Sequence, residues 1–343
     1  MDRQQAYFGN IARIAGRIRA YAPPDLIERF AAVSGFDHSS YRRCTPAFDG
    51  TITAVDGSNA LLLDAGSFAI AAIRAVECSY AGGECIHRRT TPLQVVSVGG
   101  ADDDYAELFE ECFGCRPRAL PGGEDPAAAA SVIRDTFEYW VALELAWELS
   151  EGDLLVLDGA LRVSHASHHE ILEDLLNVCN HRGVLLAAVT KRTSLTWGNG
   201  HPILPAAAGL AAKLGVGEPW YVKIPADQAI PDRQQQHTWQ QRGSQYVALL
   251  HRRAARPFKI ELPEYLEDEM ADRAFSALAA YADDGRVTGY PYPLLDAHLH
   301  CRIGIDVAEQ VRHDLIRGIC GLGMSMKEYS GLFGDYHDEF NRY

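Results

Sequence analysis

The feature that most restricts the fold of this chain is an alternation of helical and fully apolar segments between residues 126 and 189. Pro126 opens a long helix-forming stretch over residues 127–149, and an all-apolar run follows at 154–157. A second helical stretch, 167–179, leads to another apolar run at 184–189. Strands that are apolar on both faces are typical of sheets covered by helices, so the alternation predicts βαβ units and an α/β fold.

The segments on either side of this core add strands and helices. Three β-branched or apolar runs, 51–55, 67–76 and 93–98, precede it and predict an antiparallel meander. Further strands are expected at 220–224, 246–250 and 258–262, and the chain is mostly helical from residue 264. We therefore expect a ribonuclease H-like fold: a mixed sheet flanked by helices, with additional strands and a helical C-terminal part. Residues 1–45 are expected to form a helical extension, 46–320 the main domain and 321–343 a tail.

The charge distribution is uneven. The chain has 343 residues and a formal charge of −14, which at first argues against nucleic-acid binding. Residues 181–260, however, carry 11 basic and 3 acidic side chains. The basic block includes Lys191, Arg192, Arg252, Arg253, Arg256 and Lys259. It could neutralise phosphates or form an ordinary solvated surface.

The amino-terminal segment and the apolar runs bear on location. The first residues lack a signal-peptide pattern, and no run of about 18 apolar residues exists. We expect a cytoplasmic protein with no membrane span and with reduced cysteines.

Two aspartates have the same kind of sequence on either side. Asp56 and Asp158 each follow an apolar run and precede a glycine, so both are expected at the carboxyl end of a strand. Each could simply cap a turn. If they lie together, however, their mutual repulsion favours a divalent cation between them, and such ions suit phosphodiester hydrolysis.

The long helix offers a third carboxylate. Glu138 and Glu144 both lie among apolar residues, and periodicity does not choose between them as a metal ligand. Arg134 lies four residues before Glu138 and could be its partner in a purely structural arrangement.

A third group of residues lies near the C-terminus. Tyr290 precedes a helix that Pro293 opens, and His298 projects from that helix. His298 could ligate a metal or transfer protons, and Tyr290 could orient water or phosphate. Both could equally be packing residues.

Two other clusters were considered as metal sites. Cys112 and Cys115 form the only C-x-x-C and could join Cys78 and Cys85 in a zinc site, although four ordinary thiols are the simpler interpretation. The histidines of the stretch 165–169 are expected to be solvated residues at the start of a helix.

The chain resembles the NurA nuclease family in five short motifs that occur in the family's order over about residues 50–300. The motifs are Ala54-Val55-Asp56-Gly57-Ser58, Arg134 with Glu138, Leu157-Asp158-Gly159-Ala160-Leu161, Val189-Thr190-Lys191-Arg192-Thr193, and Gly289-Tyr290-Pro291-Tyr292-Pro293 with Ala297-His298. The resemblance implies a manganese-dependent DNA nuclease, with magnesium as a possible substitute, that has 5′→3′ exonuclease and single-strand endonuclease activity. It also implies a homodimer that works with a HerA-type hexameric translocase in end resection during double-strand break repair.

The resemblance also implies roles for individual residues. Asp56, Glu138, Asp158 and His298 match the metal ligands, with Glu144 as the alternative on the helix. Tyr290 and His298 match the C-terminal catalytic residues. Lys191 matches a basic residue beside the site, and Lys191 and Arg192 are expected to contact DNA.

Two rival functions remain open at this point. The chain could be a catalytically silent ribonuclease H-like scaffold of a translocase complex, although Asp56, Asp158 and His298 argue against this. It could instead be a metal-dependent phosphatase or nucleotide hydrolase, which would not need the basic block. The chain lacks a G-x-x-x-x-G-K-[ST] motif, so any ATP-driven movement must come from a partner.

Overall fold

The computed structural model describes residues 3–19, 21, 25–100, 103–121, 125–163, 165–225 and 242–334. The chain forms two compact units that interleave along the sequence. The first unit comprises Met1–Phe48, Gly159–Leu161 and Ala187–Tyr292, and the second comprises Asp49–Asp158, Arg162–Leu186 and Pro293–Tyr343. The predicted domain boundaries at residues 45 and 320 stay a prediction, and residues 335–343 of the predicted tail lie outside the described residues.

The second unit is built on a mixed sheet. Its strands are β2 (Ile52–Asp64), β3 (Ala69–Ala81), β4 (Glu84–Thr90), β5 (Gln94–Val98) and β6 (Leu154–Asp158). The strands β2, β3 and β4 form an antiparallel meander, β5 also pairs with β3, and β6 runs parallel to β2. Parallel and antiparallel pairs in one sheet confirm the predicted mixed α/β class.

The strand β4 was missing from the prediction. The predicted meander had its third strand at 93–98, which corresponds to β5, and no strand at 84–90. All residues of β4 are exposed and most are polar, so the segment carries no apolar pattern. It is a strand because the tight turn at Gly82 and Gly83 brings it alongside β3, which supplies its hydrogen bonds.

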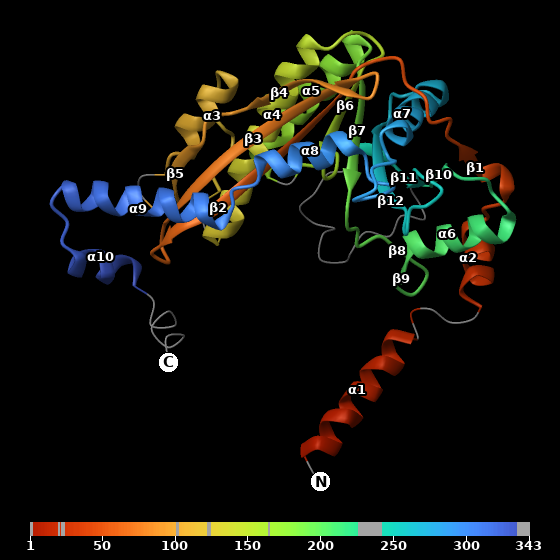
Figure 1. Ribbon diagram of the computed structural model, residues 1–343, viewed down its shortest axis with the longest axis horizontal. Helices are drawn as coiled ribbons and strands as arrows, with labels where there is room; N and C mark the ends of the chain where they lie inside the picture. The colour runs from red at the N-terminus through yellow and green to blue at the C-terminus, as the bar shows by residue number, and fades with distance from the viewer. Residues whose placement is uncertain are drawn as a thin grey trace. The chain divides into compact units, whose positions relative to one another are not determined.

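Helices cover both faces of this sheet (Figure 1). On one face α4 (Pro126–Glu148) packs against β2 and β3 and also against α5 (His169–Arg182) and α3 (Tyr105–Phe113). On the other face lie α8 (Tyr292–Cys301) and α9 (Ile305–Gly321). Apolar residues near the end of β2 (Leu62, Leu63) and near the start of β3 (Ala72) pack with side chains of α9 and of α10 (Met326–Phe333).

The first unit has an antiparallel sheet in the order β1, β10, β11, β12, β7. The strands are β1 (Tyr41–Arg43), β10 (Trp220–Ile224), β11 (Gly243–Leu249), β12 (Phe258–Pro263) and the last residues of β7 (Leu185–Thr190). The expected strands at 220–224, 246–250 and 258–262 are therefore confirmed in kind.

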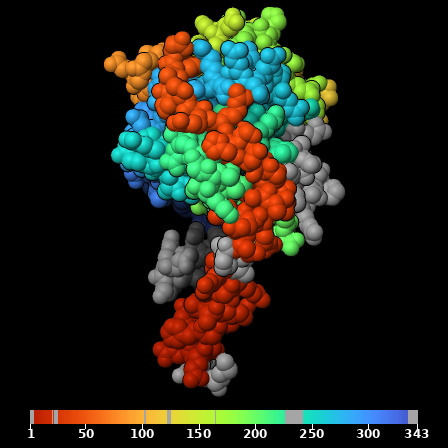
Figure 2. Space-filling view, turned by 90° about the vertical axis from the view of Figure 1, so that its right-hand side faces the viewer, coloured from red at the N-terminus to blue at the C-terminus, as the bar shows by residue number. Residues whose placement is uncertain are grey.

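The first unit also contains helices and a short hairpin. These elements are α1 (Arg3–Arg19), α2 (Leu26–Ser34), the 3-10 turn His38–Ser40, β8 (Thr196–Trp197), β9 (His201–Pro202), α6 (Ile203–Leu214) and α7 (Asp268–Ala280). Figure 2 shows α2 alongside α6, where Lys213 pairs with Glu28 at 2.6 Å. The helix α1 lies within the expected helical extension of residues 1–45, and the side chains that are described along it are largely exposed.

No helix among the described residues has both the length and the apolar character needed to cross a bilayer.

Candidate metal centre

Asp56 and Asp158 lie at the same level on two neighbouring strands. In the parallel pair of β2 and β6, Val55 is opposite Leu157, so Asp56 and Asp158 are the next residue of each strand. Asp56 is only 5% exposed. The register therefore places the two aspartates side by side on neighbouring strands of this unit.

One part of the prediction for Asp56 is wrong. Only Asp158 ends its strand, whereas β2 continues eight residues beyond Asp56, as far as Asp64. The reason is β3, which pairs with β2 from Ile52 to Asp64 and supplies hydrogen bonds through the Asp56-Gly57 sequence. A carboxylate followed by glycine suggested a turn, but the antiparallel partner overrides that local preference.

Glu138 reaches the site because Gly57 has no side chain. A Cβ at Gly57 would lie 2.6 Å from Oε1 of Glu138 and 2.9 Å from Cγ of Arg134, closer than real atoms approach. The missing side chain lets α4 press against β2 directly beside Asp56. Any larger residue at position 57 would push Glu138 and Arg134 away.

Burial is the main influence on the charge of Glu138. It raises the pKa of Glu138 well above its usual range, and Asp135, Asp56 and Asp158 raise it further. Arg134 acts in the opposite direction, with its Nε 3.4 Å from Oε1 of Glu138, so the partner expected at i−4 is present. Arg134 also pairs with Asp135 at 2.6 Å, so two carboxylates share this guanidinium.

Glu144 belongs to a different group. Its Oε2 lies 3.2 Å from Nη2 of Arg89, and the same nitrogen binds the buried Glu77 at 2.9 Å. Burial raises the pKa of Glu77, and Arg89 partly offsets this effect. The geometry therefore places Glu138, not Glu144, beside Asp56 and Asp158.

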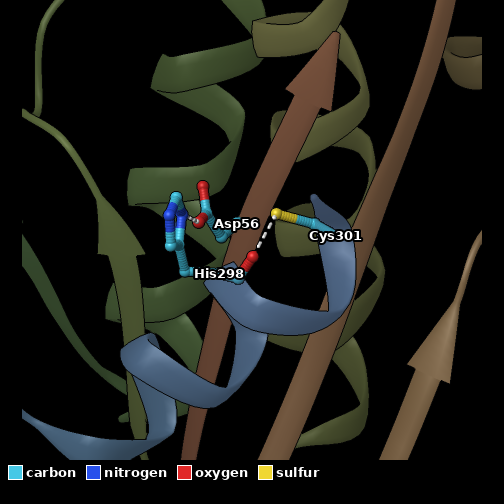
Figure 3. A group of neighbouring side chains, drawn as sticks. All are labelled: Asp56, His298 and Cys301. Carbon is cyan, nitrogen blue, oxygen red and sulfur yellow. Dashed lines mark hydrogen bonds and ion pairs between the residues drawn. The ribbon is translucent and has the colours of Figure 1, made fainter. Parts of the chain in front are cut away.

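His298 approaches Asp56 from α8, on the opposite face of the sheet from α4 (Figure 3). Its Nδ1 lies 2.8 Å from Oδ2 of Asp56, while Oδ1 of Asp56 accepts a hydrogen bond from the backbone N–H of Gly57 at 2.8 Å. The His298 side chain is 48% exposed and the Asp56 side chain is 8% exposed. The pair thus joins a buried carboxylate to a ring that solvent or a substrate can reach.

Cys301 is a neighbour of this pair that the sequence analysis did not select. Potential ligand atoms of Asp56, His298 and Cys301 lie within 4.8 Å of one another. The Cys301 thiol donates a hydrogen bond to the His298 carbonyl at 3.4 Å, and burial together with nearby Asp56 raises its pKa. The spacing His-x-x-Cys on a helix was the available signal, since residues three apart share a face.

The helix α8 is anchored near its middle by Asp296. This carboxylate is 3% exposed and accepts hydrogen bonds from Tyr80 Oη at 2.7 Å and from Arg88. Burial alone would raise the pKa of Asp296, but the bonds from Arg88 and Tyr80 outweigh it, and the pKa lies below its usual value. Asp296 is therefore ionised and ties α8 to β3 and β4.

The last turn of α8 is fixed separately. Arg74 of β3 donates from Nε to the carbonyl of Cys301 at 2.7 Å, and the N–H of Ile303 donates to Ser58 Oγ at 3.1 Å. A cation at the C-terminal end of a helix also stabilises the helix dipole. Together the two anchors hold His298 over Asp56.

The donor atoms in this region are of the kind that a hard divalent cation prefers. Asp56, Asp158 and Glu138 offer carboxylate oxygens, and His298 offers a ring nitrogen. The three carboxylates do not lie within 4.8 Å of one another, since among the described residues only Asp56, His298 and Cys301 do so. Asp56 and Asp158 add to the effect of burial on the pKa of Glu138, and a bound cation would offset their contribution.

Lys191, Arg192 and Tyr290 belong to the first unit. Nζ of Lys191 lies 5.4 Å from the centre of the Tyr290 ring, which packs on Phe258 at 5.5 Å. Gly289, with φ +98°, lets this segment approach Ala254, because an added Cβ would lie 2.4 Å from the Cβ of Ala254. Tyr290 is thereby placed near the turn that carries Arg252, Arg253 and Arg256, all of which are exposed, as is Arg192.

One member of the basic block, Lys259, does not lie on the surface. It is buried and its Nζ lies 2.5 Å from Oε1 of Glu261, while Oε2 of Glu261 accepts the N–H of Leu161. All residues of β12 are buried, because the strand lies between β11 and β7, so the charge of Lys259 balances a buried carboxylate.

The two remaining clusters do not form metal sites. Among the described residues, the only group of three or more potential ligands that converge is Asp56, His298 and Cys301, so the four thiols at 78, 85, 112 and 115 do not meet. Cys78 is fully buried and Cys85 is exposed.

The histidine cluster is partly a buried network rather than a solvated helix start. His168 is fully buried, its Nε2 lies 2.7 Å from Oγ1 of Thr136, and burial lowers its pKa to about 4. His165 bonds Ser167, which in turn bonds Tyr105 of α3. The network joins α3, α4 and the start of α5, which the isolated segment could not reveal.

Comparison with known proteins agrees with this architecture. The chain is similar over 94% of its length to the NurA nuclease from Sulfolobus solfataricus, with 11% identity, a TM-score of 0.54 and 98% of that chain covered. A NurA structure bound to dAMP and manganese aligns with 9% identity, a TM-score of 0.50, and 92% and 98% of the two chains covered. No curated protein matches the chain. The model of the NurA domain matches residues 50–303, which is more than half of the sequence and contains every residue of the candidate centre, and the chain therefore belongs to the NurA family.

Proposed function

We propose that this protein is a metal-dependent nuclease that hydrolyses DNA phosphodiesters. The observation that carries the proposal is the position of Asp56, which lies beside Asp158 in the strand register, binds His298 at 2.8 Å and precedes the glycine against which Glu138 packs. Family membership supports it, as does the related NurA structure that holds dAMP and manganese.

Asp56, Asp158 and Glu138 would hold Mn²⁺, with Mg²⁺ as an alternative, and His298 would complete the set. The metal would supply Lewis-acid stabilisation of the attacking and leaving oxygens. His298 has a second task that its geometry supports: Nδ1 holds the Asp56 carboxylate, while its exposed edge can exchange a proton with solvent or substrate.

The basic surface of the first unit would bind the nucleic acid. Lys191 and Arg192 would neutralise phosphates, and Tyr290, next to Lys191, would orient the scissile phosphate or the attacking water. The exposed arginines of the turn 252–256 would extend the phosphate-binding surface.

Further parts of the proposal rest on the family resemblance. They are the 5′→3′ exonuclease and single-strand endonuclease activities, the homodimer, and work with a HerA-type translocase in end resection and double-strand break repair. A cytoplasmic location belongs to the same set of predictions.

Replacing Asp56 with Ala tests the proposal. We expect Mn²⁺-dependent cleavage of an end-labelled single-stranded oligonucleotide to fall on the order of 10³-fold, since a metal ligand is lost. A matched control is Asp64→Ala at the exposed end of the same strand, which should cleave like the wild type. Equal cleavage by Asp56→Ala and the wild type would exclude the assignment.

A second experiment separates the nuclease from the two rival functions. Charge reversal at Arg252, Arg253 and Arg256 should weaken DNA cleavage and its salt dependence. A phosphatase or nucleotide hydrolase would keep its activity on a small phosphate ester in this variant. A silent scaffold would show no binding of Mn²⁺ in calorimetry.

A further inference from the structure

Cys301 adds a third kind of ligand atom to the Asp56–His298 pair. It follows His298 by three residues on α8, so both side chains lie on the same face of the helix. Figure 3 shows the thiol and the imidazole on either side of the Asp56 carboxylate. The ligand atoms of the three residues lie within 4.8 Å of one another, and Cys301 is 1% exposed.

The thiol is held in this position by the anchors at the end of α8. Arg74 binds the Cys301 carbonyl at 2.7 Å, and Ser58 binds the N–H of Ile303 at 3.1 Å. These bonds join the backbone around Cys301 to β2, which carries Asp56, and to its neighbour β3. The hydrogen bonds at the end of α8 therefore hold Cys301 in a fixed position relative to Asp56 and His298.

The donor set is not the one that manganese or magnesium prefers. Thiolate sulfur selects zinc-class ions, whereas Asp158 and Glu138 offer only hard oxygen atoms. Zinc takes sulfur at about 2.3 Å and nitrogen at about 2.0 Å in a tetrahedron, so neighbouring ligand atoms lie roughly 3.5 Å apart. A separation within 4.8 Å needs only a small closure to reach that spacing.

We infer that Asp56, His298 and Cys301 form a binding site for a borderline-soft divalent cation of the zinc class, which shares Asp56 and His298 with the proposed Mn²⁺ site and differs from it in Cys301. On binding, the Cys301 S–H bond breaks, a metal–sulfur bond forms and the proton leaves to solvent. The hydrogen bond between His298 and Asp56 is replaced by bonds from both residues to the metal.

If the protein is the proposed nuclease, binding of an ion at this second site should lower its activity, because both sites use Asp56. An ion held by Cys301 and His298 withdraws Asp56 from the carboxylate site and lowers Mn²⁺-dependent cleavage. Zinc would thus act as an inhibitor of the nuclease through this chain's own thiol.

Cobalt provides a readout that does not depend on activity. Titration of the metal-free full-length chain with Co²⁺ should produce a thiolate-to-cobalt absorption band in the near ultraviolet that saturates at one ion per chain. The band should disappear in both Cys301→Ser and Cys301→Ala. Both variants lack the sulfur atom, and they differ only in whether the replacement side chain is polar. Circular dichroism would establish that each variant is folded.

The matched control removes the exposed thiols instead. A Cys85→Ser/Cys115→Ser variant should keep the full band, because both residues are exposed and lie outside the converging group. The inference is overturned if the wild type shows no band, or if the band survives in both Cys301 variants.

A competition experiment then tests the shared ligand. The Zn²⁺ concentration that halves Mn²⁺-dependent cleavage, with each protein normalised to its own uninhibited rate, should be at least about tenfold higher for Cys301→Ser than for the wild type. Equal inhibitory Zn²⁺ concentrations for the two proteins would show that Zn²⁺ does not inhibit through Cys301. A cobalt band in a protein without nuclease activity would support this site and exclude the proposed function, and activity without a band would do the reverse.

Discussion

Two carboxylates of this molecule, one buried and one largely buried, differ in the cations beside them. Glu261, on β12 of the first unit, is 1% exposed and is matched by Lys259 at 2.5 Å and by the N–H of Leu161. Glu138, on α4 of the second unit, shares Arg134 with Asp135 and lies near two further carboxylates. Glu261 thus has a cation of its own, whereas Glu138 shares its arginine with a second carboxylate. A buried carboxylate with its own cation is weak evidence for a site; several carboxylates that raise the pKa of one of them are stronger evidence.

The largest expected effect concerns the activities of the two variants Glu138→Gln and Glu261→Gln. Loss of the Glu138 charge should reduce Mn²⁺-dependent cleavage on the order of 10³-fold, because a metal ligand is weakened. Glu261→Gln should leave the Mn²⁺ affinity of the folded protein unchanged. The measurements are oligonucleotide cleavage and Mn²⁺ calorimetry. Similar losses of Mn²⁺ affinity in both variants would remove the distinction between the two carboxylates.

The converse prediction concerns stability. Lys259→Met leaves Glu261 buried without its cation and should destabilise the protein by about 3 to 5 kcal/mol in urea unfolding. Restoring the balance in Lys259→Met/Glu261→Leu should recover most of the loss. If the single variant is as stable as the wild type, Lys259 is not needed to balance Glu261.

A smaller effect is expected at the anchor of α8. Asp296→Asn weakens the bonds from Tyr80 and Arg88, so His298 should lose its fixed position over Asp56. We expect Mn²⁺ affinity to fall about 10-fold to 100-fold, the usual effect of losing a residue that orients a metal ligand. Tyr80→Phe, which removes one hydrogen bond only, should lie between this variant and the wild type. A loss of thermal stability without a change in Mn²⁺ affinity would show that Asp296 supports only the fold.

The smallest effect is a gain in stability without metal. Because the pKa of folded Glu138 is raised above its usual value, ionising this group at neutral pH destabilises the metal-free fold, and the penalty disappears as the pH falls below the ordinary carboxyl pKa. Glu138→Gln should therefore stabilise the metal-free protein at neutral pH, with no gain at acidic pH. Thermal unfolding at two pH values measures it. Saturating Mn²⁺ should reverse the order, because only the wild type retains the full ligand.

Several features of the fold followed from local patterns. The long helix, the apolar strands and the three later strands were predictable because each has a clear apolar period. The strand β4 and the full length of β2 were not, because their hydrogen bonds depend on β3 rather than on their own residues. The buried state of Lys259 and His168 likewise depends on neighbours that are distant in the sequence.

For the site, the sequence by itself determined which residue types were available: two Asp-Gly pairs after apolar runs, a glutamate on a long helix and a histidine on a late one. Only the tertiary structure decided between Glu138 and Glu144, because the choice depends on Gly57 admitting α4 against β2 and on Arg89 holding Glu144 elsewhere. It also brought Cys301 to Asp56 across more than 240 positions. Periodicity describes which face of an element a residue occupies, but a metal site depends on which faces of different elements meet.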